Sequence, residues 1–468
     1  MAIFLKRWVP ALSMATLLTG GLMASGAKAQ DAVGEWNGLL NVGAAELRIG
    51  VTIEAGPGGA LTGKLASPDQ GAMQIPLQDI RMDQGRLTFA VPSIRGRYEG
   101  QWDASQGVWN GSWTQGGALP LTLAKGPAPT RARPQVPAKP YPYREEEVRI
   151  SSARGVSLAG TLTLPLGKGP FPAAVLISGS GPQDRDEQLL GHRPFLVLAD
   201  HLTRQGIAVL RYDDRGFGRS TGRFSEATSS DFAVDAGAAV AFLRARKDIV
   251  AANVGLIGHS EGGAIGPMVA AKDPRIGFVV LLAGPGVRSR DLMMAQRRAV
   301  GRVMGLAGPG VERNDRAVAC IDAVLAETPD WEAAKVEAAR LLGEAAAEAG
   351  VAPETLMARS TMLFTPWYRE FIAYDPRPNL ETLRMPVLAV NGANDVQVVA
   401  SQNLPAVREA LRANPDVTVI ELPGLNHLFQ TSATGDPREY GRIEETFAPA
   451  ALKVIGDWVV AKTGAGPR

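Results

Sequence analysis

The sequence predicts an α/β protein whose mostly parallel sheet carries helices on both faces, preceded by a small all-β domain. Between residues 30 and 125, short stretches with a period of two residues alternate with glycine-rich turns. A proline-rich segment at 126–144 is typical of a semi-rigid linker. From residue 145 to 465, continuous apolar strands alternate with helices, which favours a sheet buried on both faces. A length of 468 residues also exceeds what one hydrophobic core usually supports.

Residues 1–29 have the pattern of a secretory signal. Lys6 and Arg7 precede an apolar run from Trp8 to Met23, and Ala27-Lys28-Ala29 fits a small-residue cleavage site. A retained membrane anchor is the alternative interpretation, but proline, serine, threonine and glycine interrupt the apolar run. We therefore expect an exported chain that begins at Gln30, in a bacterial periplasm or the medium, with no stable membrane anchor after cleavage.

Charge and cysteine content exclude several classes of function. The formal net charge is +2, and loss of the three positive charges of residues 1–29 leaves −1 for the mature chain. A nearly neutral chain has no electrostatic reason to bind nucleic acid or an anionic membrane surface. Cys320 is the only cysteine, which rules out an intrachain disulfide and a thiolate metal cluster.

The predicted β domain repeats an aromatic residue followed two positions later by glycine. The pattern occurs at Trp36-Asn37-Gly38, Tyr98-Glu99-Gly100 and Trp109-Asn110-Gly111, with Trp102 and Trp113 close by. The aromatic residues could form a platform for a carbohydrate or another ligand. The favoured interpretation is that they fill a small meander or barrel whose glycines relieve crowding.

The second half of the chain predicts the elements of the α/β sheet in order. An opening hairpin is followed by six further strands, with intervening helices, the first of which is stopped by Gly206. Ser229 and Ser230 are available as caps of the second helix. The predicted strands are 148–150, 158–164, 173–177, 207–211, 254–257, 277–282, 387–390 and 417–422, and the predicted helices are 194–205, 231–246 and 448–460.

A long interruption at about 288–380 replaces this alternation with helical patterns rich in Ala, Glu and Arg. An unstructured loop of such length is implausible in a compact domain, so we expect three or four helices that form a cap over the sheet. An aromatic group at Trp367, Tyr368, Phe371 and Tyr374 has the spacing of an apolar helix face. The cap's methionines could line an acyl pocket or serve ordinary packing: Met293, Met294, Met304, Met357 and Met362.

The strongest chemical signal is Gly258-His259-Ser260-Glu261-Gly262, directly after a predicted buried strand and before a predicted helix. A serine on a tight strand-to-helix turn projects its hydroxyl above the sheet, and the flanking glycines leave room for a strained backbone. The sequence therefore predicts Ser260 as a nucleophile for acyl transfer.

A serine nucleophile needs a base, and the base needs an acid that orients it. Of the four histidines, His192 and His201 belong to a helical region and His259 lies inside the nucleophile turn, which leaves His427 after a strand. Asp395 follows the preceding strand and is the candidate acid, although an aspartate there could simply form a turn.

Two backbone N–H groups are expected to stabilise the oxyanion. One belongs to Glu261, directly after the nucleophile, and the other to Ser180 in the glycine-rich loop Ser178-Gly179-Ser180-Gly181-Pro182. An ordinary glycine turn would have the same residues. Further along this loop, Arg185 could pair with Glu261 or bind a carboxylate of the substrate.

Residues 145–465 resemble the α/β-hydrolase superfamily, because these motifs occur in that family's order and Asp213-Asp214-Arg215-Gly216-Phe217-Gly218-Arg219-Ser220 is similar to its D-x-R-G-x-G-x-S loop. The Ser-Gly-Ser-Gly-Pro and Gly-His-Ser-Glu-Gly-Gly motifs look most like bacterial carboxylesterases near the serine aminopeptidase-like branch. Ser178 departs from the family, in which many members have histidine. Residues 31–125 resemble a small domain found in exported bacterial hydrolases.

The leading functional hypothesis is a serine esterase acting on a small-molecule ester or acyl substrate through Ser260, His427 and Asp395. No metal or organic cofactor is implied, because the histidines and the cysteine cannot form a closed zinc site and no phosphate-binding glycine loop is present. A peptidase or amidase could use the same three residues. A noncatalytic exported binding protein, with the hydrolase fold as a scaffold, is the third hypothesis.

Overall fold

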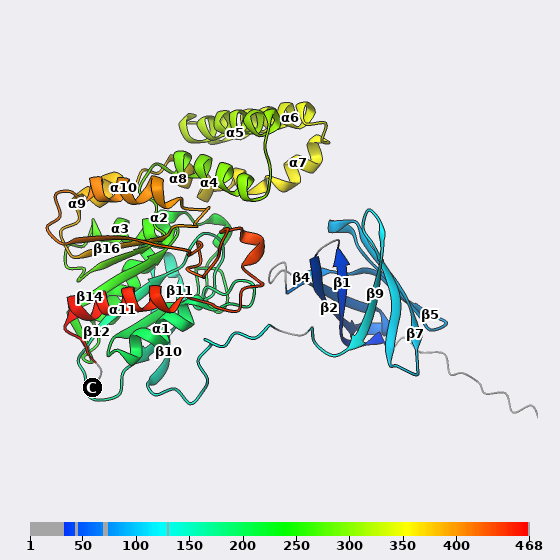
Figure 1. Ribbon diagram of the computed structural model, residues 1–468, viewed down its shortest axis with the longest axis horizontal. Helices are drawn as coiled ribbons and strands as arrows, with labels where there is room; N and C mark the ends of the chain where they lie inside the picture. Colours follow the sequence, from blue (N-terminus) through cyan, green and yellow to red (C-terminus); the bar gives the residue numbers. More distant parts are fainter. Residues whose placement is uncertain (1–31, 43–44, 69–73, 129–130, 467–468) are drawn as a thin grey trace, which may run out of the picture. The chain divides into compact units, whose positions relative to one another are not determined.

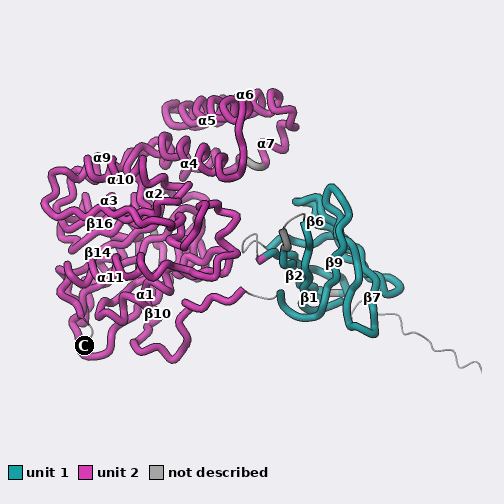
Figure 2. The backbone as a smooth tube through the Cα atoms, viewed as in Figure 1, with its two compact units in different colours: residues 1–67, 74–129 teal, residues 68–73, 130–468 magenta. Residues whose placement is uncertain are grey.

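The computed structural model describes residues 32–42, 45–68, 74–128 and 131–466. The predicted signal at 1–29 lies outside the described residues. Contacts divide the chain into two compact units, formed by the described residues of 1–67 and 74–129 and by those of 68–73 and 130–468 (Figure 2). Among the described residues, none of the helices has both the length and the apolar character required to cross a membrane.

The N-terminal unit is one antiparallel sheet that follows a meander, with strand order β4-β3-β2-β1-β9-β8-β7-β6-β5. Its strands are β1 (Gly34–Val42), β2 (Ala45–Ala55), β3 (Leu61–Ala66), β4 (Gln74–Pro76), β5 (Gln78–Asp83), β6 (Arg86–Val91), β7 (Gly96–Asp103), β8 (Val108–Thr114) and β9 (Ala118–Lys125). Along β7, buried and exposed residues alternate, as expected for a sheet with one face in the core.

The repeated aromatic residues form the core of this unit. Trp36, Tyr98 and Trp109 are each at most 1% exposed, and Tyr98 stacks on Phe89 with ring centroids 5.0 Å apart. A Cβ atom at Gly111 would lie 2.5 Å from the Tyr98 hydroxyl, so a larger residue there would collide with the ring. The packing interpretation is confirmed for these three aromatic residues, and the ligand-platform interpretation is wrong for them.

The C-terminal unit contains an eight-stranded sheet with the order β10-β11-β13-β12-β14-β15-β16-β17 (Figure 1). The opening hairpin is antiparallel, β11 pairs antiparallel with β13, and all later pairs are parallel. The strands are β10 (Arg144–Ser151), β11 (Ser157–Leu164), β12 (Phe171–Ile177), β13 (Ala208–Tyr212), β14 (Ile249–His259), β15 (Val279–Leu282), β16 (Val387–Gly392) and β17 (Val417–Leu422). The predicted fold class is confirmed.

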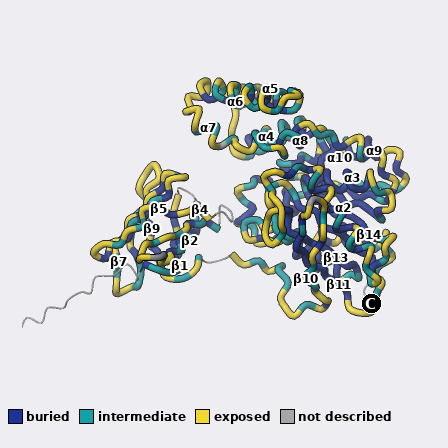
Figure 3. The backbone as a smooth tube through the Cα atoms, turned by 180° about the vertical axis from the view of Figure 1, so that it is seen from behind, coloured by how far each residue is buried: buried dark blue, intermediate teal, exposed yellow. Residues whose placement is uncertain are grey.

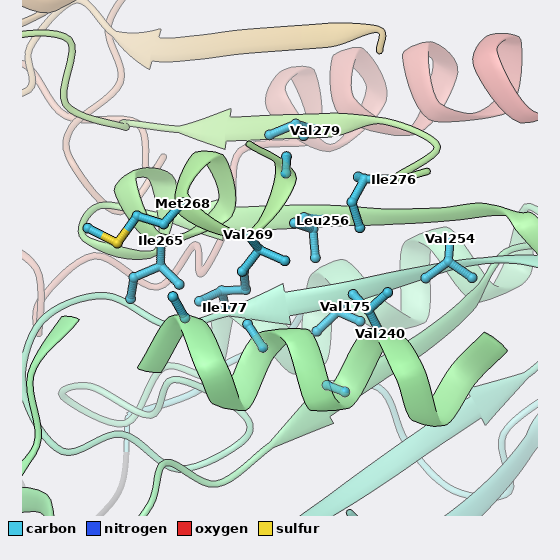
Figure 4. Packing of buried hydrophobic residues seen from close by; sticks show 14 of the residues in the cluster. Val175, Ile177, Val240, Val254, Leu256, Ile265, Met268, Val269, Ile276 and Val279 are labelled. Carbon is cyan, nitrogen blue, oxygen red and sulfur yellow. The ribbon is translucent and has the colours of Figure 1, made fainter. Parts of the chain in front are cut away.

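Helices cover both faces of this sheet because successive strand residues point to opposite sides. On β12, Val175 and Ile177 pack into one cluster with helices α2 (Ser229–Arg244), α3 (Gly262–Ala270), α9 (Arg377–Thr382) and α10 (Ala400–Ala410). Ala174 and Leu176 pack into the other cluster with α1 (Pro194–Arg204) and α11 (Pro449–Thr463). Figure 4 shows the first cluster, in which α2 and α3 direct Val240 and Ile265 toward the strands.

Helix α2 begins at a different cap from the one expected. Thr228, rather than Ser229 or Ser230, is the N-cap residue, and it forms a reciprocal capping box with Asp231. Ser229 instead donates a hydrogen bond to Glu261. The sequence has three adjacent hydroxyl residues, and Thr228 is the one followed at the third position by an acidic residue, Asp231, that completes a capping box.

The region between β15 and β16 is helical, as predicted, but contains more helices than expected. They are α4 (Ser289–Val303), α5 (Pro309–Glu327), α6 (Trp331–Glu348), α7 (Pro353–Arg359), α8 (Pro366–Ala373) and α9. Ile321, Leu342 and Tyr368 belong to a separate hydrophobic cluster that joins α5, α6 and α8. Figure 3 shows buried and exposed residues side by side along α5 and α6, as expected for helices that pack on one side only.

Candidate active site

Ser260 lies on the turn between β14 and α3 and has a left-handed backbone conformation, with a φ of 54°. This conformation is unfavourable for a residue other than glycine, and the Ser260 N–H donates a 2.8 Å hydrogen bond to Leu282 that helps to hold it. A Cβ atom at Gly258 would lie 2.0 Å from the Gly262 carbonyl oxygen. Glycine is therefore required beside the turn. Within the described part of the chain, the Ser260 hydroxyl makes no hydrogen bond.

His427 and Asp395 meet at the same edge of the sheet, because both follow parallel strands. Asp395 comes after β16 and His427 after β17, and the Nδ1 atom of His427 lies 2.8 Å from Oδ2 of Asp395. Oδ1 of Asp395 accepts hydrogen bonds from the backbone N–H groups of Gln397 and Val398. Since a carboxylate can only accept, Nδ1 carries a proton, and in the neutral imidazole the lone pair then belongs to Nε2.

The structure leaves two backbone N–H groups available beside Ser260. Among the described residues, neither the Ser180 N–H nor the Glu261 N–H donates a hydrogen bond, whereas the Gly179 N–H is engaged by Glu187. A Cβ atom at Gly179 would lie 3.2 Å from Cβ of Ser260, so the loop after β12 is packed against the serine. Two unpaired donors beside a strained serine have the arrangement that stabilises an oxyanion.

The loop after β12 is held by the aspartates that follow β13. Ser178, at the position where the α/β-hydrolase family often has histidine, donates a 2.9 Å hydrogen bond to Oδ1 of Asp214. The Gln183 N–H donates to Oδ2 of the same carboxyl group. Burial raises the pKa of Asp214 to about 8 despite these hydrogen bonds. Burial therefore shifts Asp214 toward its neutral form, and its two carboxyl oxygens hold the loop after β12.

Arg185 does not have the partner that the sequence suggested. Its Nε and Nη2 atoms donate to Asp213, and its Nη1 atom donates to Glu147 and Thr161. The predicted pairing with Glu261 is wrong, because Asp213 on the neighbouring loop offers both carboxylate oxygens to the guanidinium. With its donors engaged in this way, Arg185 braces the loop, which disfavours a role in binding a substrate carboxylate.

Glu261 connects the serine turn to the cap. Its buried Oε1 atom accepts a 2.5 Å hydrogen bond from the Ser229 hydroxyl and a 2.8 Å hydrogen bond from Nε1 of Trp367 on α8. Burial raises the pKa of the Glu261 carboxyl, although the hydrogen bonds that it accepts lower it. Sequence spacing placed Trp367 on an apolar helix face, and the indole does stack on Phe371 with centroids 5.0 Å apart. The hydrogen bond from Trp367 to Glu261 could not be predicted from any pattern in the sequence.

The methionines of the cap do not form a single pocket. Met293 and Met304 line a largely apolar cavity of about 540 Å³ between α4 and α5. Met362 is 56% exposed. The cavity is therefore formed by two of the five candidate methionines, together with aliphatic residues such as Val300, Leu306 and Val311.

The chain is similar in sequence to known proteins. The chain is 34% identical to Esterase EstD of Thermotoga maritima over 157 residues, which are 34% of this chain and 36% of the esterase. It is 30% identical to an uncharacterised Mycobacterium tuberculosis protein over 176 residues, which are 38% of this chain and 56% of that protein. The matches thus span between about a third and just over half of these relatives.

Solved structures similar to this chain include the Pyrococcus furiosus esterase Pf2001, with a TM-score of 0.44 and 16% identity, covering 72% of this chain and 98% of that one. They also include the α/β-hydrolase GrgF from a Penicillium species, with a TM-score of 0.44 and 19% identity, covering 69% and 99%.

The family model described as "Serine aminopeptidase, S33" matches residues 193–431, which are more than half of the chain. The matched region includes the turn of Ser260 and the strand ends of Asp395 and His427. The chain therefore belongs to this serine aminopeptidase-like family of the α/β-hydrolase superfamily.

Proposed function

We propose that the protein is a serine hydrolase that cleaves carboxylic esters through Ser260, His427 and Asp395. One observation carries the proposal: the 2.8 Å hydrogen bond between Asp395 and His427 forms at the sheet edge where the strained turn of Ser260 also lies. The His427 ring centroid is 4.8 Å from that of His259, the residue directly before Ser260, which supports the proposal that the imidazole acts on the serine.

In the first half of the proposed reaction, Oγ of Ser260 attacks the ester carbonyl carbon while Nε2 of His427 takes the hydroxyl proton. The carbonyl oxygen becomes an oxyanion that accepts hydrogen bonds from the N–H groups of Ser180 and Glu261. Asp395 keeps the proton on Nδ1 and stabilises the imidazolium. The intermediate then expels the alcohol, which takes the proton from Nε2, and an acyl-enzyme remains.

In the second half, a water molecule takes the place of the alcohol. Nε2 of His427 removes a proton from the water as its oxygen attacks the acyl carbon, and the same two N–H groups stabilise the second oxyanion. The C–O bond to Ser260 breaks, the serine oxygen recovers the proton from Nε2, and the carboxylic acid leaves. The hydrogen bond from the Ser260 hydroxyl to Nε2 of His427 is absent from the described part of the structure and forms when the substrate binds, since catalytic hydrogen bonds are often completed only in the substrate complex.

An ester substrate is favoured by the name of the Thermotoga maritima relative, which is an esterase. A peptidase or amidase is the second candidate, because the matching family is described as a serine aminopeptidase. A peptidase would need a charged group that binds a chain terminus. The side chains of Glu261, beside the serine, and of Arg185, in the loop after β12, are already engaged by other side chains.

The test compares p-nitrophenyl esters of graded acyl length with aminoacyl p-nitroanilides, using the mature protein and Ser260→Ala. We expect ester hydrolysis that Ser260→Ala abolishes, and labelling of the wild-type protein alone by a fluorophosphonate probe. Activity on the anilides alone would favour the peptidase. Absence of labelling in the wild-type protein would favour a noncatalytic binding protein.

We propose further that the protein is exported and that its N-terminal signal is removed after Ala29. The proposal is supported by the pattern of Lys6, Arg7, the apolar run and the Ala-Lys-Ala site. N-terminal sequencing of the protein secreted by a bacterial host should begin at Gln30. A chain that is retained in the membrane with its first residues intact would support the membrane-anchor alternative.

A further inference from the structure

His259, which precedes the nucleophile, is a buried residue with two partners. Its side chain is 8% exposed, its Nδ1 atom lies 2.9 Å from Oε1 of Glu187, and its Nε2 atom lies 2.9 Å from the His427 carbonyl oxygen. A carbonyl oxygen and a carboxylate can both only accept hydrogen bonds. Both ring nitrogens therefore carry protons, and the contact with Glu187 is a buried imidazolium–carboxylate pair.

The charge of this pair is consistent with its surroundings. Burial by itself lowers the pKa of His259, but the charge of Glu187 and the hydrogen bonds to Glu187 and His427 outweigh burial, so the pKa is raised above its ordinary value. Glu187 is 5% exposed, and removal of either partner would leave a charge buried without compensation.

Glu187 also reaches the loop that carries Ser180. The Oε1 atom that faces His259 accepts a 2.7 Å hydrogen bond from the Gly179 N–H, one residue before the Ser180 N–H. Glu187 itself has a left-handed backbone conformation with a φ of 52°, and its N–H donates to the Asp184 carbonyl. A glutamate in this unfavourable conformation needs support from its surroundings, which is typical of residues at functional sites.

The contacts of the pair involve the segments that carry the proposed oxyanion donor, nucleophile and base. Gly179 precedes the oxyanion donor Ser180, His259 precedes the nucleophile Ser260, and the Nε2 atom of His259 binds the backbone of the proposed base. These three segments follow β12, β14 and β17, so they are far apart in the sequence. We propose that Glu187 and His259 form a positioning pair that sets the distances among the oxyanion donor, the nucleophile and the base.

The inference rests on the proposed function, and substitutions at Glu187 test it. In Glu187→Gln, one amide oxygen can still accept from Gly179, but the negative charge beside His259 is gone. In Glu187→Ala, both contacts are lost. A misplacement of about 1 Å at a catalytic site can lower the rate on the order of 10²-fold. We therefore expect kcat for a p-nitrophenyl ester to fall about 10-fold in Glu187→Gln and about 100-fold in Glu187→Ala, with KM changed less than about 3-fold.

The matched control is Asp273→Asn, which removes a carboxylate paired with Arg244 and Arg275 at the opposite edge of the sheet. It should lower thermal stability without changing kcat. The rate of labelling by a fluorophosphonate probe, expressed per folded molecule, should fall in the order wild type, Glu187→Gln, Glu187→Ala. If Glu187→Ala does not fold, the comparison of Glu187→Gln with Asp273→Asn decides.

The labelling experiment distinguishes failure of the positioning pair from failure of the proposed function. If the wild-type protein is labelled and Glu187→Gln reacts at the wild-type rate, the positioning pair is refuted while the proposed function stands. A loss in Glu187→Gln that appears only as a lower folded fraction, as in the control, refutes the pair as well. If the wild-type protein is not labelled at all, the proposed function fails, and the positioning pair fails with it.

Discussion

Substitution of Gln135 by alanine should weaken the C-terminal unit although the residue lies in the proline-rich segment. Its Nε2 atom donates a 2.6 Å hydrogen bond to the Phe447 carbonyl oxygen. Its Oε1 atom accepts from the N–H groups of Thr446, at 2.6 Å, and Phe447, at 3.0 Å. One side chain thus satisfies three backbone groups of a segment that has no regular secondary structure.

The burial of these backbone groups sets the expected loss of stability in Gln135→Ala. Thr446 and Phe447 are 1% and 2% exposed, so their backbone groups would lose partners in a buried place. Each unsatisfied buried group costs ~1–3 kcal/mol, but a water molecule can enter the space left by the amide and recover part of it. We expect Gln135→Ala to lower the free energy of unfolding by about 2–4 kcal/mol, which is a fall in Tm of about 3–6 °C for a unit of this size.

The substitution should also lower the proposed esterase activity. Phe447 stacks on Phe429, two residues after His427, with centroids 5.4 Å apart, and the Ala448 N–H donates to the Phe429 carbonyl. Differential scanning fluorimetry and kcat measure the two effects, and hydrogen exchange should show lost protection of the amides of residues 446 and 447. Lys139→Ala is the control, because that exposed ion pair with Glu145 contributes little. A Gln135→Ala protein with the Tm, the activity and the exchange of the wild type would refute this reasoning.

Three further predictions follow from the site. Asp395→Asn should lower kcat on the order of 10⁴-fold because it favours the wrong tautomer of His427, and a loss below 10-fold in ester assays would contradict the assigned role. Burial raises the pKa of Asp214 from 3.8 to about 8, so its stabilising contribution is complete below the pKa of the unfolded chain and is fully lost once the pH has passed 8. The Tm of Asp214→Asn relative to wild type should therefore rise between about pH 5 and 8 and level off above pH 8, and a constant difference between about pH 5 and 8 would contradict this linkage. Trp367→Phe removes one hydrogen bond to Glu261 and should lower the free energy of unfolding by roughly 1 kcal/mol in chemical denaturation, whereas Trp367→Ala should lower it several-fold more.

Features that depend on local pattern could be predicted from the sequence. Strands with a continuous apolar run were recognisable, and in a parallel sheet their carboxyl ends must share one edge. Elimination among the four histidines identified His427, the strand before it identified Asp395, and the structure joins their side chains at 2.8 Å. The strained turn of Ser260 was likewise indicated by the adjacent glycines, whose lack of a Cβ atom the close contact at Gly258 requires.

Partner choice among polar side chains could not be predicted in the same way. Arg185 has acidic residues both beside it in the loop and elsewhere in the site, and only the folded arrangement directs it to Asp213. Glu261 and Trp367 are 106 residues apart, and their hydrogen bond depends on how α8 packs over the turn. Such contacts depend on how the helices and strands pack against one another. Hydrophobic periodicity in the sequence predicts the elements but not these contacts between them.

The proline-rich segment shows why composition alone misleads about structure. Pro134, Pro137, Pro140 and Pro142 restrict the unfolded chain, so ordering this segment costs less conformational entropy than ordering a glycine-rich one. A few hydrogen bonds can then hold it: besides those of Gln135, the Arg133 guanidinium donates to the carbonyl oxygens of residues 190, 441 and 443. A proline-rich composition, typical of a flexible or semi-rigid linker, is therefore also compatible with a segment that is fixed to the domain by hydrogen bonds. Through these bonds the segment supports the loop that carries His427, although it lies outside the α/β sheet.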